Sequence, residues 1–267
     1  MHQEGEKDMK TKIMGILNVT PDSFSDGGKY NAVDKALKHC EEMIKEGATI
    51  IDIGGESTRP GYEKISVQEE IDRVVPVIEK IRDSFDTTIS IDTYKAPVAS
   101  AAVKAGADII NDIWGLRYDD DMASVVVNTQ AEYIMMHNRP EQNPVWTMSD
   151  FMDMFNEDIN YALSKGINRN KIIYDPGIGF AKTQDQNVEI LAHLDDMRKL
   201  DIPVLLGASR KSVINYICDL PVDERLEGTL ATTAAAVLGG CEYVRVHDVR
   251  ENYRFIQMFE AILQARK

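Results

Sequence analysis

Cysteine is scarce in this sequence of 267 residues. The three cysteines, Cys40, Cys218 and Cys241, are an odd number, and no two of them have the C-x-x-C spacing of zinc and redox sites. The sequence therefore indicates neither a disulfide framework nor a zinc site. Because unpaired cysteines are usual in reducing compartments, we expect a cytoplasmic protein.

Long apolar runs are absent too. No stretch approaches the roughly 20 consecutive apolar residues that a membrane-spanning helix needs, so we expect no membrane association. Residues 1–11, MHQEGEKDMKT, are polar and lack the apolar segment of a secretion signal. We expect these residues to be a flexible arm and residues 12–267 to form a single domain.

Positive charge is in deficit. Lysine and arginine together number 30 against 44 aspartates and glutamates, which gives a net charge of −14 at neutral pH. Proteins that bind nucleic acids or anionic membranes present a basic surface to the phosphate groups. We therefore expect no nucleic-acid partner, and an anionic substrate would need a local cluster of basic residues.

The chain does contain a repeated pattern, in which a short apolar run is followed by a helical segment. Runs that are apolar at nearly every position suit parallel strands buried on both faces. Eight such strand–helix units predict one (β/α)8 barrel, with a doubly wound open sheet as the alternative, because a strand count does not establish closure. The eight runs are residues 12–19, 49–55, 88–94, 108–113, 132–138, 171–177, 203–209 and 243–249.

The segments between the runs have helical features. Ser66 and Glu69 have the spacing of a capping box at the start of a helix over residues 66–85. Pro76 interrupts the ideal pattern of that helix and is expected to kink it or to lie near its first turns. A helix over residues 31–47 ends in a glycine suited to a left-handed cap.

Polar residues end every one of the eight runs. Active sites of such barrels lie at the carboxyl ends of the strands, so these side chains would meet at one mouth. Asp92, Asn111 and Asp175 offer acceptors and an amide for a heterocycle with an amino-pyrimidinone edge. A second group offers donors for an anion, and the pattern therefore predicts a ligand with a polar ring and a phosphate. The second group is Asn18, Thr58, Arg59, Arg245 and His247.

Seven motifs carry a family resemblance. They are GILNVTPDSFSDGG (15–28), GGESTRPG (54–61), SIDTY (90–94), NDI (111–113), YDPGIGFAKT (174–183), GASRKS (207–212) and RVHDV (245–249). In this order they resemble the dihydropteroate synthases, which are pterin-binding TIM-barrel enzymes, from about residue 12 to the end of the chain. The resemblance implies condensation of 6-hydroxymethyl-7,8-dihydropterin pyrophosphate with para-aminobenzoate. The products would be 7,8-dihydropteroate and pyrophosphate, a step of folate synthesis.

The resemblance also implies a role for each matched residue. Lys211 would donate to the ring carbonyl of the pterin, Arg245 would lie against the ring, and Asp26 would stabilise a cationic intermediate of an SN1-like reaction. The implied pterin pocket is Asp92, Asn111, Asp175, Lys211 and Arg245, with walls from Met136, Ile113, Phe180 and Gly207. The implied diphosphate pocket is Asn18, Thr58, Arg59, Arg245 and His247, and the implied para-aminobenzoate side is Phe24, Pro60, Ser209 and Lys211.

Further expectations follow from the same resemblance. Asn18 would ligate Mg²⁺, and the first two loops would be open or mobile without ligand. Sulfonamides would inhibit, because they resemble para-aminobenzoate, and the chain would form a homodimer. His137 is interpreted as structural, and Asp52, Glu56 and Asp112 as supporting residues without direct ligand contact.

Two other functions are compatible with a pterin-binding barrel. Methyltetrahydrofolate methyltransferases share the acidic pterin pocket, but they need a corrinoid partner and no anion or aminobenzoate site. A barrel that binds pterin without turnover is the second alternative. The motifs NVTPDSF, STRP and RVH, which would build the anion and aminobenzoate sites, argue against the methyltransferase. The intact residues Asn18, Arg59, Lys211, Arg245 and His247 argue against the inactive barrel.

Overall fold

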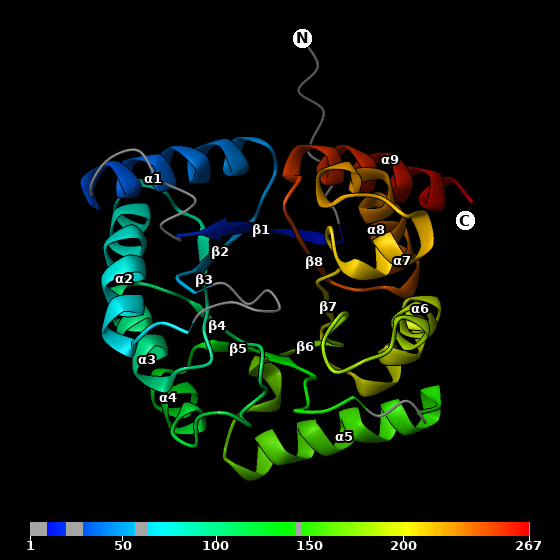
Figure 1. The fold of residues 1–267 in the computed structure, drawn as a ribbon, viewed down its shortest axis with the longest axis horizontal. Helices are drawn as coiled ribbons and strands as arrows, with labels where there is room; N and C mark the ends of the chain where they lie inside the picture. The colour runs from blue at the N-terminus through cyan, green and yellow to red at the C-terminus, as the bar shows by residue number, and fades with distance from the viewer. Residues whose placement is uncertain (1–9, 20–28, 57–63, 143–145, 267) are drawn as a thin grey trace.

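The fold is an eight-stranded parallel barrel surrounded by helices (Figure 1). The computed structural model describes residues 10–19, 29–56, 64–142 and 146–266. The strands are β1 (Lys12–Asn18), β2 (Ile50–Gly54), β3 (Thr88–Asp92), β4 (Ile109–Asp112), β5 (Glu132–Met136), β6 (Ile172–Asp175), β7 (Leu205–Leu206) and β8 (Tyr243–Val246).

The ring of strands closes between β6 and β7. Parallel pairing runs from β6 through β5, β4, β3, β2 and β1 to β8 and β7. A single parallel bridge between Tyr174 and Val204 completes the circle, and the Tyr174 amide donates to the Pro203 carbonyl at 2.8 Å. This closure confirms the predicted (β/α)8 barrel and shows that the alternative, an open doubly wound sheet, is wrong.

Helices alternate with the strands and form the outer layer (Figure 1). They are α1 (Lys29–Lys45), α2 (Val67–Ser84), α3 (Ala96–Ala105), α4 (Met122–Thr129), α5 (Met148–Ser164), α6 (Gln184–Ala192), α7 (Ser212–Cys218), α8 (Leu226–Gly239) and α9 (Val249–Ala265). Short 3-10 turns lie at η2 (Arg169–Lys171), η3 (Leu194–Leu200) and η4 (Val222–Glu224). In the described part of the chain, no helix is both long enough and apolar enough to cross a membrane.

The helix boundaries agree with the sequence signals in part. Ser66 caps α2, and its Oγ accepts the Glu69 amide at 3.1 Å. The Glu69 carboxylate pairs with Arg73 one turn later, so only half of the predicted capping box forms. Pro76 lies in the middle of α2 rather than near its first turns, and Gly47 has the predicted left-handed conformation, with φ 108°.

The first residues of the described chain are held against the barrel. The Thr11 amide donates to Glu260 Oε1 at 3.0 Å, and the Lys10 amide donates to Glu260 Oε2 at 3.1 Å. Residues 1–9 of the expected arm lie outside the described residues. The division of the chain at residue 11 therefore stays a prediction.

The inside of the barrel is apolar at one level and polar at the next. Six buried side chains fill the interior as a cluster, namely Met14, Ile50, Ile109, Ile134, Ile173 and Leu205. Side chains in a strand alternate in direction, so a residue two positions later points the same way. From β2, β4 and β6 that next residue is Asp52, Asn111 or Asp175, which places polar groups above the apolar cluster.

Candidate active site

Arg245 lies between two carboxylates at the mouth of the barrel. Its Nε donates to Asp52 Oδ2 at 2.6 Å, and its Nη2 donates to Asp92 Oδ2 at 2.6 Å. Burial disfavours the charged guanidinium, but the two carboxylates outweigh it and hold the pKa of Arg245 above its usual value. Arg245 on β8 is therefore fixed from β2 and β3 at once.

Asp92 keeps one oxygen available. Its Oδ2 accepts from Arg245, whereas its Oδ1 is buried and has no hydrogen-bond partner among the described residues. Burial raises the pKa of Asp92 to about 7, against the opposing effect of the Arg245 charge. A buried oxygen without a partner costs free energy, which a ligand N–H would recover.

Asp52 connects two of the predicted pterin residues. It is fully buried, and besides Arg245 it accepts the Asn111 amide, with Nδ2 3.3 Å from Oδ2. Asp52 was expected to support the site without direct ligand contact, and this stays a prediction. Its contacts fix the direction in which Asn111 and Arg245 point.

Asp175 ends β6 on the other side of the mouth. Its Oδ1 accepts the Gly177 amide at 2.7 Å, and a Cβ on Gly207 of the neighbouring segment would come within 3.3 Å of its Oδ2. Burial raises the pKa of Asp175, and the Lys211 charge lowers it. The missing side chain at Gly207 thus leaves space beside Asp175 Oδ2.

Lys211 follows β7 and reaches across to the β6 loop. Its Nζ donates to the Ile178 carbonyl at 2.5 Å and lies 4.3 Å from the centre of the Phe180 ring. Burial lowers the pKa of Lys211 to about 8, and Asp175 opposes that shift. The preceding residue, Arg210, has a left-handed backbone with φ 56°, which is uncommon for a residue other than glycine.

The predicted apolar walls come together. Ile113 and Met136 form one buried cluster with Tyr94, and Phe180 and Trp114 pack against it. Tyr94 and Trp114 were not among the predicted residues, although Tyr94 belongs to the quoted SIDTY motif. The cluster gives the mouth an apolar side beside the polar residues.

His247 and Ser209 face each other on the β7–β8 side. Ser209 Oγ lies 3.0 Å from His247 Nδ1 and accepts the His247 amide at 3.2 Å. Next to them, the Arg210 guanidinium makes an ion pair with Asp248. Ser209 therefore contacts a residue of the predicted diphosphate pocket, although the resemblance assigned it to the para-aminobenzoate side.

Asn18 lies at the mouth next to Asp92, because both border the same position on Gly54. Asn18 ends β1, and its Oδ1 is 3.7 Å from where a Cβ on Gly54 would lie. Five others fall outside the described residues, namely Phe24, Asp26, Thr58, Arg59 and Pro60. The first two loops, which were predicted to be open or mobile without ligand, also fall outside the described residues.

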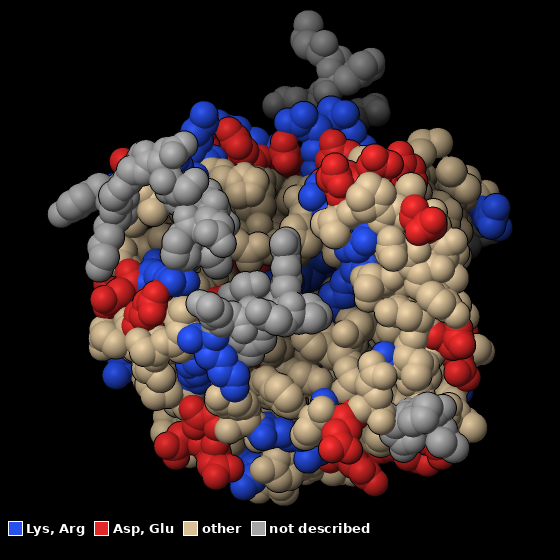
Figure 2. All heavy atoms as spheres, in the orientation of Figure 1, with Lys and Arg blue, Asp and Glu red and all other residues tan. Residues whose placement is uncertain are grey.

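Basic side chains gather at this mouth despite the acidic composition. Figure 2 shows lysine and arginine side chains at the hollowed centre of the face and acidic side chains around its rim. Two basic residues at the strand ends, Arg245 and Lys211, make contacts there with Asp52 and with the Ile178 carbonyl. The sequence predicted such a local cluster for an anionic substrate.

His137 is buried beneath the mouth, as its structural interpretation anticipated. Its Nδ1 lies 3.0 Å from Lys182 Nζ, and its ring packs on Trp146, Phe151 and Phe155. Burial lowers the pKa of His137, so the ring is neutral. Sequence reasoning did not single out Lys182, although the quoted YDPGIGFAKT motif contains it.

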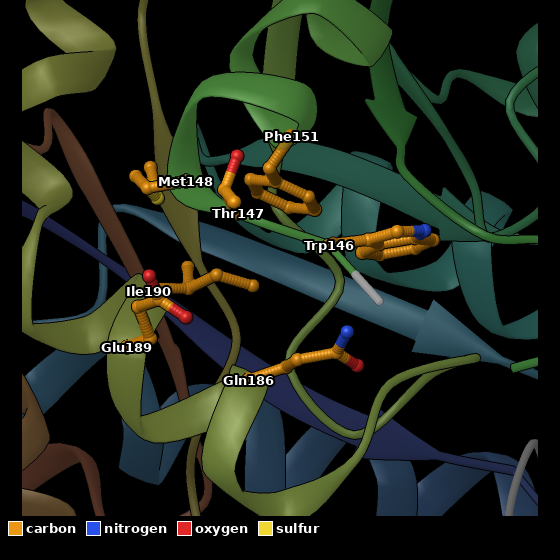
Figure 3. Close-up of a pocket in the computed structure, with 7 residues that line it drawn as sticks. All are labelled: Trp146, Thr147, Met148, Phe151, Gln186, Glu189 and Ile190. Atoms are coloured by element: carbon orange, nitrogen blue, oxygen red, sulfur yellow. The ribbon is translucent and has the colours of Figure 1, made fainter. Parts of the chain in front are cut away.

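A small pocket lies between the start of α5 and helix α6 (Figure 3). Its lining is Trp146, Thr147, Met148, Phe151, Gln186, Glu189 and Ile190. None of these residues was predicted to belong to the site. The chemistry-bearing groups gather at the barrel mouth instead.

Comparisons with known proteins agree with this geometry. The profile of the family described as "Pterin binding enzyme" matches residues 14–247. A dihydropteroate synthase of Clostridium beijerinckii is 52% identical over 256 residues, covering 96% of this chain and 95% of the relative. That of Bacillus subtilis is 53% identical over 254 residues, covering 95% of this chain and 89% of the relative.

Solved structures give the same result. Dihydropteroate synthase of Clostridium difficile, crystallised in the presence of pteroic acid, superposes with a TM-score of 0.91 at 48% identity, covering 98% of this chain and 99% of that one. The Yersinia pestis enzyme in a sulfonamide drug complex has a TM-score of 0.88 at 41% identity, covering 97% and 96% of the two chains. With its closed barrel and polar mouth, the chain belongs to the dihydropteroate synthase family of pterin-binding enzymes.

Proposed function

We propose that the chain carries out its dihydropteroate synthase reaction at the barrel mouth, with the pterin ring bound between Asp175 and Asp92. The reaction is the condensation of 6-hydroxymethyl-7,8-dihydropterin pyrophosphate with para-aminobenzoate in folate synthesis. The observation that carries the proposal is the pair of buried carboxylates with available oxygens. Asp92 Oδ1 has no partner among the described residues, and Asp175 Oδ2 faces the space left by Gly207.

The pterin contacts follow from the donors and acceptors of the pocket. Asp175 accepts from the amino group and the ring N–H, because two carboxylate oxygens match two parallel donors. Lys211 donates to the ring carbonyl, and Asn111 and Asp92 bind the remaining polar edge. Arg245 lies against the ring, and the walls are the buried side chains of Met136 and Ile113, the partly buried Phe180, and Gly207.

The diphosphate binds at the β8 side of the mouth. Arg245 and His247 supply donors there, with Asn18 from β1, and Thr58 and Arg59 complete the set. The support from the described residues is the placement of His247 against Ser209 and of Arg245 above Asp52. Charge neutralisation by these groups makes pyrophosphate a good leaving group.

Asn18 would hold Mg²⁺ together with oxygens of the diphosphate. Among the described residues, no group of three or more histidine, cysteine, aspartate or glutamate side chains could hold a metal ion. One amide oxygen nevertheless fits Mg²⁺, which keeps several waters and takes few protein ligands beside substrate phosphates. The ion would supply further neutralisation of the leaving diphosphate.

The reaction proceeds by a dissociative, SN1-like path. Departure of pyrophosphate leaves a cation on the pterin methylene that is delocalised into the electron-rich ring, and Asp26 stabilises it. Para-aminobenzoate binds against Phe24, Pro60, Ser209 and Lys211. Its nitrogen attacks the cation to form the C–N bond and then releases one N–H proton to the departed pyrophosphate. A weak aniline nucleophile gains more from orientation and exclusion of water than from a general base.

A turnover assay tests these assignments. It follows dihydropteroate formation from dihydropterin pyrophosphate and radiolabelled para-aminobenzoate, with Mg²⁺ or with EDTA. We expect Mg²⁺-dependent product that falls by about 10²-fold or more in Asp175→Asn and Lys211→Ala. Well-folded protein that binds pterin without turnover would instead support the inactive barrel. Methyl transfer from methyltetrahydrofolate to a corrinoid, without dihydropteroate formation, would support the methyltransferase.

Sulfonamide inhibition and cytoplasmic location extend the proposal. A sulfonamide should compete with para-aminobenzoate, as the Yersinia pestis complex suggests for that enzyme. Competition is measured as a rise in the KM for para-aminobenzoate at constant kcat.

The cysteines support the proposed cytoplasmic location. All three are free, which suits a reducing compartment.

A homodimer would cover the apolar surface on α7, α8 and α9. Ile217, Leu238 and Met258 are exposed on these three helices, which pack side by side (Figure 1). Exposed apolar side chains that gather on neighbouring elements mark interaction surfaces. Light scattering should give the mass of two chains, and Leu238→Glu with Met258→Glu should shift it to one.

A further inference from the structure

Lys182 is a buried lysine that the proposed reaction does not use. It lies on the loop between β6 and α6 and is 2% exposed. Its Nζ donates to the carbonyls of Gly177 at 3.0 Å, Phe180 at 3.0 Å and His137 at 3.2 Å. His137 Nδ1 lies 3.0 Å from the same nitrogen.

The surroundings of Lys182 are unusual for a buried ammonium. Lys95, the comparable case in this chain, makes ion pairs of 2.7 Å with both Glu56 and Glu70. Among the described residues, Lys182 has no carboxylate at ion-pair distance. Burial lowers the pKa of Lys182 to about 7, so its charge is held at a cost in free energy.

The turn that Lys182 binds needs an external support. Gly177, Gly179 and Ala181 have left-handed φ angles of 70°, 83° and 49°, and the last is uncommon for alanine. A Cβ on Gly177 would lie 2.1 Å from the His137 carbonyl oxygen, so the turn packs directly on the end of β5. Three hydrogen bonds from one ammonium join the turn to that strand.

The same turn makes the contacts that place two of the proposed pterin residues. The Gly177 amide donates to Asp175 Oδ1 at 2.7 Å. The Ile178 carbonyl accepts from Lys211, whose ammonium lies over the Phe180 ring. Lys182 binds the carbonyls of Gly177 and Phe180. The amide of Gly177 contacts Asp175, and the ring of Phe180 contacts Lys211.

We propose that Lys182 is a positioning residue for pterin binding, whose ammonium holds the turn over residues 177–180 so that Asp175 and Lys211 face the ring together. The proposal rests on the pterin pocket described under the proposed function. It assigns Lys182 no contact with substrate. It predicts that loss of the ammonium weakens pterin binding in protein that is still folded.

The first test compares Lys182→Met with the folded wild type. Titration calorimetry with pteroic acid should show affinity about tenfold or more weaker in Lys182→Met. Ile78→Ala, in the buried core of α2, is the matched control, because it lowers the unfolding temperature far from the mouth without changing this affinity. If Lys182→Met binds pteroic acid as the wild type does, the proposal is wrong, whatever happens to its unfolding temperature.

The pH dependence of binding separates positioning from general loosening. Asp175 faces three cations, Lys211, Arg245 and Lys182, and each lowers its pKa. Without the Lys182 charge, the pKa of Asp175 rises, so the acidic fall in pteroic acid affinity should move to higher pH. Ile78→Ala, which loosens the fold without removing a charge, should leave this midpoint where it is.

Two further variants keep the test decisive. If Lys182→Met does not fold, Lys182→Gln is measured in the same way, because it removes the charge but keeps an amide donor. Asp175→Asn is titrated beside them. If Asp175→Asn loses affinity for pteroic acid while the Lys182 variants bind like the wild type, the inference about Lys182 is wrong and the pterin pocket is still supported. If Asp175→Asn binds with wild-type affinity, the proposed pterin pocket itself is wrong.

Discussion

Arg245 and Asp92 share one hydrogen bond of 2.6 Å, and it leaves the other oxygen of Asp92 buried without a partner among the described residues. The ligand-free protein therefore holds a carboxyl group that is only partly compensated. Such groups are typical of binding sites, where residues kept for ligand binding lower the free energy of unfolding below the value that other side chains would give.

The pH dependence of stability should reveal this group. Asp92 has a pKa of about 7 in the folded chain and about 3.9 when unfolded, so the folded chain holds a proton that the unfolded chain releases between these values. The free energy of unfolding should therefore fall as pH rises from about 4 to 7. Asp92→Asn mimics the protonated form and should be more stable than wild type at pH 8, by on the order of 2 kcal/mol.

Urea unfolding at pH 4 and pH 8 measures that difference. The gain should shrink at pH 4, where the wild-type carboxyl is protonated in the folded chain. The same variant should bind pteroic acid more weakly, because its amide replaces an acceptor. Equal stability of the two proteins at pH 8 would contradict the prediction.

Removal of the Asp52 carboxylate should disorder two neighbours together. Asp52→Ala leaves Arg245 and Asn111 without the partner that sets their direction. We expect kcat/KM for the pterin substrate to fall by about 10²-fold, with a smaller effect in Asp52→Asn, which keeps the shape and one acceptor. Steady-state kinetics of both variants measure these losses in kcat/KM. Equal losses in Asp52→Ala and Asp52→Asn would indicate that the charge of Asp52, rather than the geometry it imposes, matters.

A methyl group at Gly207 should block part of the pterin pocket. The added Cβ in Gly207→Ala would lie 3.3 Å from Asp175 Oδ2, in the space assigned to the ring edge. We expect pteroic acid affinity to fall by about tenfold or more, with an unfolding temperature close to that of wild type. Calorimetry and a thermal scan measure the two effects, and unchanged affinity would place the ring elsewhere.

Lys211 should set an alkaline limit to pterin binding. Its pKa is lowered to about 8, so its ammonium loses a proton as pH rises through that value. Affinity for pteroic acid should therefore decline above about pH 8 in the wild type. Lys211→Arg stays charged throughout, so whatever affinity it retains should not show this decline, and a wild-type profile that is flat to pH 10 would remove Lys211 from the pocket.

The sequence was sufficient to predict the architecture and the strand ends that carry the site. Asp175, Asn111 and Arg245 could be singled out because each is polar at the end of a buried run. The 203–209 run predicted a long strand, but β7 covers only Leu205 and Leu206, since Pro203 has no amide to donate and the backbone after Leu206 leaves the sheet and turns at Ser209. The length of an apolar run in the sequence therefore does not predict how many of its residues pair with a neighbouring strand.

Two kinds of feature were beyond sequence patterns. Asp52 could be named as a supporting residue, but its two partners lie on β4 and β8, far away in the chain. Lys182 looked like one more polar residue after a glycine-rich turn, and only its three carbonyl partners distinguish it from a surface lysine. Hydrogen bonds between distant segments follow from packing, which periodicity does not encode.

The closure between β6 and β7 has a mechanical consequence. One bridge at Tyr174 joins these strands, whereas every other neighbouring pair shares at least two registered positions. Asp175 ends β6 and Lys211 follows β7, so they lie on opposite sides of this weakly paired junction. A ligand that binds both residues would stabilise the junction, so hydrogen–deuterium exchange at the Tyr174 amide should slow when pteroic acid is bound.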